Sequence, residues 1–184
     1  MADLPFPLSG TTLVVGPSNA GKTRLTARAL DAWVAADGAE GIVVFDFAPV
    51  VERDGTVLGG RLTQFTTPPD DAWYGVLDAH APRDDSDDET GATRLAADNA
   101  ARAATLFDSA PPTPTAVFVN DATIPFQHSS GNLSRFLDYC DSAAVVVCNA
   151  FESDALGVDD AVSREEQRTL ARLKRWADRT AALG

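Results

Sequence analysis

The chain has 184 residues, of which 45% are apolar, and it carries a formal net charge of −12. This length and apolar content are typical of one domain with a full hydrophobic core, and they exclude a wholly disordered chain. No run of about 18 apolar residues occurs, which excludes a membrane-spanning helix, and the first residues lack the basic and apolar regions of a secretory signal.

Apolar strands and helices alternate along the sequence. Strands are predicted at 11–15, 42–45, 73–80, 116–119 and 143–148, with a further extended segment or hairpin at 56–65. Helices are predicted at 22–36, 93–108 and 133–139, and from a capping-box pattern at 163–166 to the C-terminus. A run of acidic residues at 84–89 is expected to be a solvated loop. The alternation predicts one α/β domain over residues 1–184 with a mainly parallel sheet.

A phosphate-binding loop connects the first predicted strand to the first predicted helix. The pattern G-x-x-x-x-G-K-[ST] is matched in full by Gly16, Pro17, Ser18, Asn19, Ala20, Gly21, Lys22 and Thr23. In such a loop the backbone N–H groups and the helix dipole bind phosphate, the lysine reaches the β- and γ-phosphates, and the hydroxyl ligates Mg²⁺. The sequence therefore predicts that these residues, with Arg24, bind a nucleotide and Mg²⁺.

The rarity of lysine strengthens this prediction. Lysine occurs twice in the chain, at Lys22 and Lys174, so its presence in the loop indicates a role that arginine cannot take. Guanine-specific proteins carry an Asn/Thr-Lys-x-Asp segment, but Lys174 is followed by Arg175 and Trp176. The missing segment favours ATP over GTP.

The acidic composition with few lysines is typical of proteins from salt-loving microbes and predicts a cytoplasm of high salt. The same charge disfavours a broad nucleic-acid footprint, but high salt also weakens the repulsion, so direct nucleic-acid binding is left open. Cys140 and Cys148 are too few for a disulfide framework or zinc site and are expected to be buried thiols.

Polar residues follow four of the other predicted strands, at the sheet edge where ligands of α/β proteins bind. Asn120 and Asp121 follow the strand at 116–119. Either Asn120 takes the metal position and Asp121 is the catalytic base, or Asp121 serves the metal and no strong base exists. The remaining candidates for an acceptor-binding or γ-phosphate-sensing role are Asp46, Arg83 and Asn149.

The loop at Gly16–Thr23 and the Asn120-Asp121 pair resemble the P-loop NTPase superfamily. The resemblance implies a three-layer α/β/α sandwich across the whole chain. The sequence is similar to small RecA-like ATPases, including genome-packaging ATPases. These carry Asp-Glu where this chain has Asn120-Asp121, and a polar sensor after the next strand. The sequence is also similar to adenosylcobinamide-type kinases. Those kinases have a comparable phosphate loop and a Thr-Asn-Glu segment near the place of Asn120-Asp121 in this chain.

The first branch implies a Mg²⁺-dependent ATPase, catalysed through Lys22 and Asp121, that acts as a homo-oligomer or with a protein partner, as in nucleic-acid packaging or remodelling. The departure of Asn120-Asp121 from Asp-Glu predicts that hydrolysis is slow. The second implies a small-metabolite kinase with Asp46 and Arg83 at the acceptor. A third hypothesis is a non-catalytic switch that binds ATP and changes shape. The sequence predicts no membrane partner.

Overall fold

The computed structural model describes residues 3–58, 60–153 and 159–184. Its strands are β1 (Gly10–Gly16), β2 (Ile42–Asp46), β3 (Val51–Arg53), β4 (Thr56–Leu58), β5 (Trp73–Val76), β6 (Ala116–Asn120), β7 (Val145–Phe151) and β8 (Arg179–Ala182). Its helices are α1 (Lys22–Asp37), α2 (Glu89–Ser109), α3 (Leu133–Cys140) and α4 (Ala161–Trp176), with the short 3₁₀ helices η1 (Leu62–Gln64) and η2 (Ile124–Phe126).

Six of the strands form one parallel sheet in the order β5-β2-β6-β7-β1-β8. The two short strands β3 and β4 pair antiparallel as a separate hairpin. Because all strands of the large sheet run in one direction, their carboxyl ends lie at one edge. In this order β7 lies between β1, which leads into the phosphate-binding loop, and β6, which leads into Asp121.

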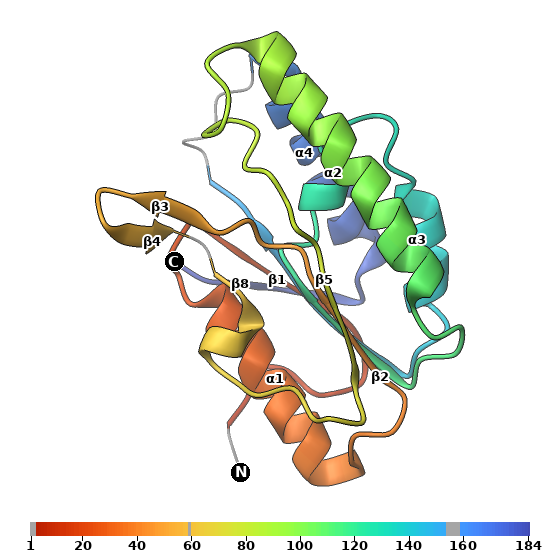
Figure 1. The fold of residues 1–184 in the computed structure, drawn as a ribbon. Coiled ribbons are helices and arrows are strands. Elements are labelled where there is room, and N and C mark those ends of the chain that lie inside the picture. The colour runs from red at the N-terminus through yellow and green to blue at the C-terminus, as the bar shows by residue number, and fades with distance from the viewer. Residues whose placement is uncertain (1–2, 59, 154–158) are drawn as a thin grey trace.

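Helices cover both faces of the sheet, as Figure 1 shows: α1 lies on one face, and α2, α3 and α4 lie on the other. The strand residues alternate between two cores. Val44 and Phe118 belong to the core on the α1 side, whereas their neighbours Phe45 and Val119 belong to the core on the other side. All four side chains are fully buried, because the sheet is covered on both faces. The predicted α/β/α sandwich is confirmed.

Several predicted boundaries are wrong. The helix predicted to reach the C-terminus ends at Trp176, and β8 then pairs with β1. The capping-box prediction at 163–166 is also wrong, because Asp160 caps α4 by accepting a hydrogen bond from the Ser163 N–H at 2.8 Å. Helix α2 begins within the acidic run that was expected to be a loop, where Asp88 caps it through the Gly91 N–H. Strand β5 ends at Val76.

Within the described ranges, no helix is long and apolar enough to cross a membrane. Cys140 and Cys148 are buried, free thiols, as expected, and burial raises the pKa of both.

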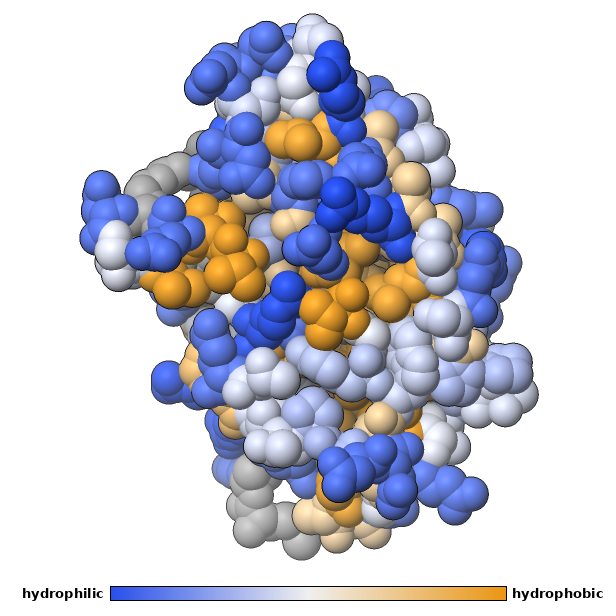
Figure 2. Space-filling model, viewed as in Figure 1, coloured by the Kyte–Doolittle hydropathy of each residue, from blue (hydrophilic) through white to orange (hydrophobic). Residues whose placement is uncertain are grey.

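The surface charge predicts that the thermal stability of the protein increases with salt. Hydrophilic residues cover much of the face shown in Figure 2, and the net charge is −12. We expect the melting temperature to rise by several degrees between dilute buffer and molar KCl, because the Debye length falls from about 30 Å at 0.01 M to about 3 Å at 1 M. Thermal unfolding across a KCl series measures this. A steady fall with salt would instead indicate that exposed ion pairs dominate.

Candidate nucleotide-binding site

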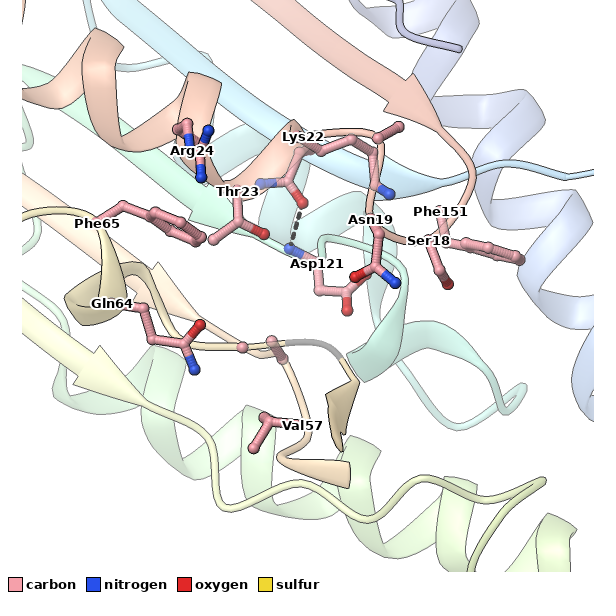
Figure 3. A pocket seen from close by; sticks show the side chains of 15 residues that line it. Ser18, Asn19, Lys22, Thr23, Arg24, Val57, Gln64, Phe65, Asp121 and Phe151 are labelled. Carbon is pink, nitrogen blue, oxygen red and sulfur yellow. Dashed lines mark hydrogen bonds between the residues drawn. The ribbon is translucent and has the colours of Figure 1, made fainter. Parts of the chain in front are cut away.

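A pocket of about 440 Å³ opens at the carboxyl edge of the sheet. The phosphate-binding loop and the start of α1 form one wall, the connection between β2 and β5 forms the opposite wall, and the ends of β6 and β7 form the floor (Figure 3). The lining residues are Ser18, Asn19, Ala20, Gly21, Lys22, Thr23, Arg24, Ala48, Val57, Gly60, Gln64, Phe65, Asp121, Asn149 and Phe151.

The backbone of the loop has the curvature that phosphate binding requires. Asn19 and Gly21 have left-handed φ angles of 62° and 92°, and Gly21 is the residue from which α1 starts. Glycine adopts this conformation without strain, and asparagine tolerates it better than most residues. Gly16 has no space for a side chain, because an added Cβ would meet the Leu183 carbonyl oxygen. Gly16 and Pro17 shape the loop from outside the pocket lining.

Lys22 lies across the loop from which it comes. Its Nζ donates a hydrogen bond to the Pro17 carbonyl at 2.6 Å and lies 5.7 Å from the centroid of the Phe151 ring. Burial lowers the pKa of Lys22 from its ordinary value, and the nearby Asp121 carboxylate opposes that effect. A partly desolvated ammonium of this kind interacts strongly with phosphate, because little water must be removed from it.

Thr23 is connected to a buried polar chain that crosses the sheet. The Thr23 hydroxyl donates to Asn120 Oδ1 at 3.2 Å, and Asn120 Nδ2 donates to Asp46 Oδ1 at 2.8 Å and to the Gly60 carbonyl at 2.8 Å. Asp46 Oδ2 accepts from the Leu62 N–H at 2.8 Å and from the Tyr74 hydroxyl at 2.6 Å. Both Asn120 and Asp46 are almost completely buried, at 1% and 0% exposed. This series of buried hydrogen bonds fixes the position of the Thr23 hydroxyl relative to β6 and β2.

Asp121 follows Asn120 and reaches into the pocket, as Figure 3 shows. Its φ angle is 63°, in the left-handed region, and its N–H donates to Asn149 Oδ1 at 3.0 Å. Asn149 Nδ2 in turn donates to Thr26 Oγ1 at 2.9 Å and to Asn120 Oδ1 at 3.1 Å. The amide of the predicted sensor residue therefore holds the turn at Asp121 against α1, and its own polar groups are engaged in doing so.

The pKa of the Asp121 carboxyl is raised to about 6. Burial is the main cause, the Glu166 carboxylate adds to it, and Lys22 opposes it. A carboxyl with this pKa is largely ionised at neutral pH, yet it is a stronger base than an ordinary aspartate.

Glu166 is a buried acid behind Asp121 that the sequence analysis assigned to a helix cap. Its side chain is 3% exposed, it accepts from Arg83 Nη1 at 2.6 Å, and it accepts from the Thr123 hydroxyl at 2.9 Å. The predicted acceptor or sensor residue Arg83 therefore forms an ion pair with α4, away from the pocket lining. The hydrogen bond from the Thr123 hydroxyl, two residues after Asp121, holds that segment against α4.

The donor set fits a magnesium ion held mainly by its nucleotide. In the part of the chain that the structure describes, no group of three His, Cys, Asp or Glu side chains could hold a metal ion without other ligands. Mg²⁺ in nucleotide sites is held by phosphates, waters and one or two protein oxygens. The Thr23 hydroxyl, hydrogen-bonded to Asn120, is a protein oxygen of this kind, and the Asp121 carboxylate lines the same pocket.

The structure brings together most of the predicted site residues: the loop from Ser18 to Arg24, Asp121 and Asn149 line one pocket, and Asn120 lies directly behind Thr23. Asp46 lies beneath the pocket lining, where its carboxylate accepts hydrogen bonds from Asn120, Leu62 and Tyr74. Sequence reasoning missed the wall formed by Val57, Gly60, Gln64 and Phe65, because these residues carry no motif and reach the pocket through tertiary packing. Comparison with models of known protein families finds no match, and no curated protein sequence matches the chain.

Proposed function

We propose that this protein binds ATP with Mg²⁺ in the pocket and hydrolyses it slowly, with a partner or further copies of itself accelerating the reaction. The observation that carries the proposal is the gathering of the loop, Lys22, Thr23 and Asp121 around one pocket at the carboxyl edge of a parallel sheet. The position of Asn149 on β7, between β1 and β6, supports the resemblance to RecA-like ATPases, which place a polar sensor on that strand.

Each residue has a chemical role in this proposal. The backbone N–H groups of the loop bind the phosphates, and Lys22 neutralises charge that develops as the bond between the γ-phosphorus and its bridging oxygen breaks. Asp121 accepts a proton from the water that attacks the γ-phosphorus, and ADP leaves. When bound, Mg²⁺ neutralises phosphate charge, and the Thr23 hydroxyl, fixed in position by Asn120, is the group that would hold it.

Two features favour slow turnover by the isolated chain. Asp121 occupies a position where related ATPases have the longer Glu, and both arginines that the sequence places at the site have partners: Arg83 pairs with Glu166, and Arg24 lies over Phe65. An arginine from a second chain would supply transition-state charge that these two do not. Turnover per chain is therefore expected to increase with protein concentration or with a partner.

The alternatives make different demands on the site. A metabolite kinase needs an acid that reaches the acceptor hydroxyl, but the Asp46 carboxylate is fully buried and bound to Asn120, Leu62 and Tyr74. Production of ADP that depends on an added metabolite would favour the kinase. Binding without turnover at any protein concentration would favour the switch.

Nucleotide binding is tested by replacing Lys22 with alanine. We expect the variant to lose most of its affinity for Mg²⁺-ATP, because it removes the cation that meets the β- and γ-phosphates. Isothermal titration calorimetry in molar KCl measures both proteins, and Arg135→Ala, which removes an exposed cation of α3 outside the pocket lining, serves as the control. Equal affinities for ATP in the Lys22→Ala variant and the parent would contradict the proposal.

A further inference from the structure

We propose that Phe65, supported by Arg24 and flanked by Gln64, forms a subsite on which the nucleobase of the bound nucleotide stacks. The inference rests on the proposed function, since it extends the phosphate-binding wall of the pocket to the rest of the nucleotide. It assigns a role to a wall of the pocket that the phosphates alone would leave unused.

Phe65 is an aromatic side chain held at the pocket although it is 41% exposed. Its backbone is fixed: the N–H groups of Phe65 and Thr66 donate to the Leu62 carbonyl at 2.9 and 3.1 Å. Leu62 is fully buried, its own N–H donates to Asp46, and the Thr66 hydroxyl donates to Asp31 on α1. An exposed phenylalanine on a rigid backbone is a preformed contact surface and not a packing defect.

Arg24 supports the ring from the adjacent helix. Its guanidinium carbon lies 5.2 Å from the centroid of the Phe65 ring, a cation–π contact. The contact joins η1 to the first turn of α1, so the ring is positioned relative to the phosphate-binding loop. Figure 3 shows the ring of Phe65 pointing from its wall toward Thr23.

The direction of the loop indicates which end of a nucleotide would reach Phe65. Lys22 and Asp121 mark the γ-phosphate end, because one binds the terminal phosphates and the other faces the attacked phosphorus. Arg24 follows Thr23 into the helix, beyond the residues that bind the terminal phosphates. In Figure 3 Arg24 and Phe65 lie together at the end of the pocket away from Phe151. The nucleoside therefore extends toward Phe65.

Gln64 provides polar groups beside this platform. Its side chain is exposed and lines the pocket, and its amide packs against Gly60, where an added Cβ would overlap it. The carboxamide oxygen accepts hydrogen bonds and the carboxamide NH₂ group donates them. These match the N6–H₂ donor and the N7 acceptor on the edge of adenine. Val57 on the β3–β4 hairpin lines the same pocket and offers the nucleoside an apolar contact. Its side chain is 48% exposed, and apolar surface gathers near this hairpin in Figure 2.

Calorimetry with two ligands tests the subsite. Mg²⁺-ATP and Mg²⁺-tripolyphosphate are titrated into the parent protein, Phe65→Ala and Phe65→Trp, with Val76→Ala as a control for loss of an exposed apolar side chain outside the pocket. Phe65→Ala is expected to bind ATP about 5- to 150-fold more weakly, the range for losing one base–aromatic stack. Its tripolyphosphate affinity is expected to stay unchanged, as are all affinities of Val76→Ala, and Phe65→Trp is expected to retain ATP binding.

A second readout is independent of affinity. The ring protons of Phe65 are expected to shift in the NMR spectrum when ATP is added, through the ring current of the stacked base, and to remain in place with tripolyphosphate. Equal losses for the two ligands in Phe65→Ala, or an unchanged ATP affinity, would overturn the subsite. Tripolyphosphate binding that withstands Lys22→Ala would instead contradict the proposed function, so the two failures are distinguishable.

Discussion

Replacement of Asp121 by asparagine is expected to reduce ATP hydrolysis by about 10²- to 10⁴-fold, the usual contribution of a general base, while Mg²⁺-ATP still binds. Asparagine is nearly isosteric and tolerates the left-handed backbone at this position, so the fold and the loop should be retained. Phosphate release and calorimetric affinity, measured on the same preparation, separate the two effects.

The pH dependence expected of the proposed reaction follows from the pKa of about 6 for Asp121. As a base it must be ionised, so kcat/KM for hydrolysis, which reports groups of the unbound protein, should fall as the pH drops through about 6. The raised pKa also means that folding favours the protonated form, and the stability that this contributes is lost as the pH rises through 6. Asp121→Asn should therefore be more stable than the parent at neutral pH, by about 1–2 kcal/mol after allowance for solvent screening.

Lower activity combined with higher stability is the result expected for a charge kept for function. Asp138→Asn on the exposed face of α3 is the matched control, and it should change neither property. Vigorous turnover by the parent at nanomolar concentration that survives Asp121→Asn would contradict the role of Asp121 as the base.

The parts of the fold that follow from local patterns could be predicted. Runs such as Val117-Phe118-Val119 are apolar on both faces, which is the pattern of a strand covered by helices on both sides. The final strand, Arg179–Ala182, could not be predicted in this way, because its residues alternate between half-buried and exposed and its partner β1 lies about 170 positions earlier. Asp160 and Ser163 both match a cap, and only the hydrogen bond of the folded helix distinguishes them.

The same division applies to the site. A contiguous motif specifies the loop and Lys22, because phosphate binding needs those residue types at that spacing. Contacts between distant segments position Phe65 and Glu166: Phe65 contacts Arg24 at the pocket, and Glu166 holds the segment after Asp121 through the hydrogen bond from Thr123. Neither contact leaves a pattern in the sequence, so both residues had to be found in the folded chain.

The asparagine at position 120, where the RecA-like ATPases that the sequence resembles have aspartate, has a physical reason in this structure. Its Nδ2 donates to the Asp46 carboxylate and to the Gly60 carbonyl, both buried, and an aspartate has no group that could make either bond when ionised. The Asp-Glu pattern of the RecA-like branch is therefore incompatible with an ionised Asp46 in contact with residue 120.

Asn120→Asp is accordingly expected to lower the free energy of unfolding by about 3–5 kcal/mol at neutral pH, because it places an unpaired buried charge against Asp46. At low pH the introduced carboxyl is protonated, and its O–H can then donate to Asp46 in place of the lost amide. The loss should therefore be smallest near about pH 4 and increase with pH. Urea unfolding at several pH values measures this loss in the free energy of unfolding.

Asn132→Asp is the control, since residue 132 caps α3 by accepting a hydrogen bond from the Arg135 N–H, which aspartate does equally well. A loss in Asn120→Asp that is small or independent of pH would show that residue 120 and Asp46 are not in the contact described.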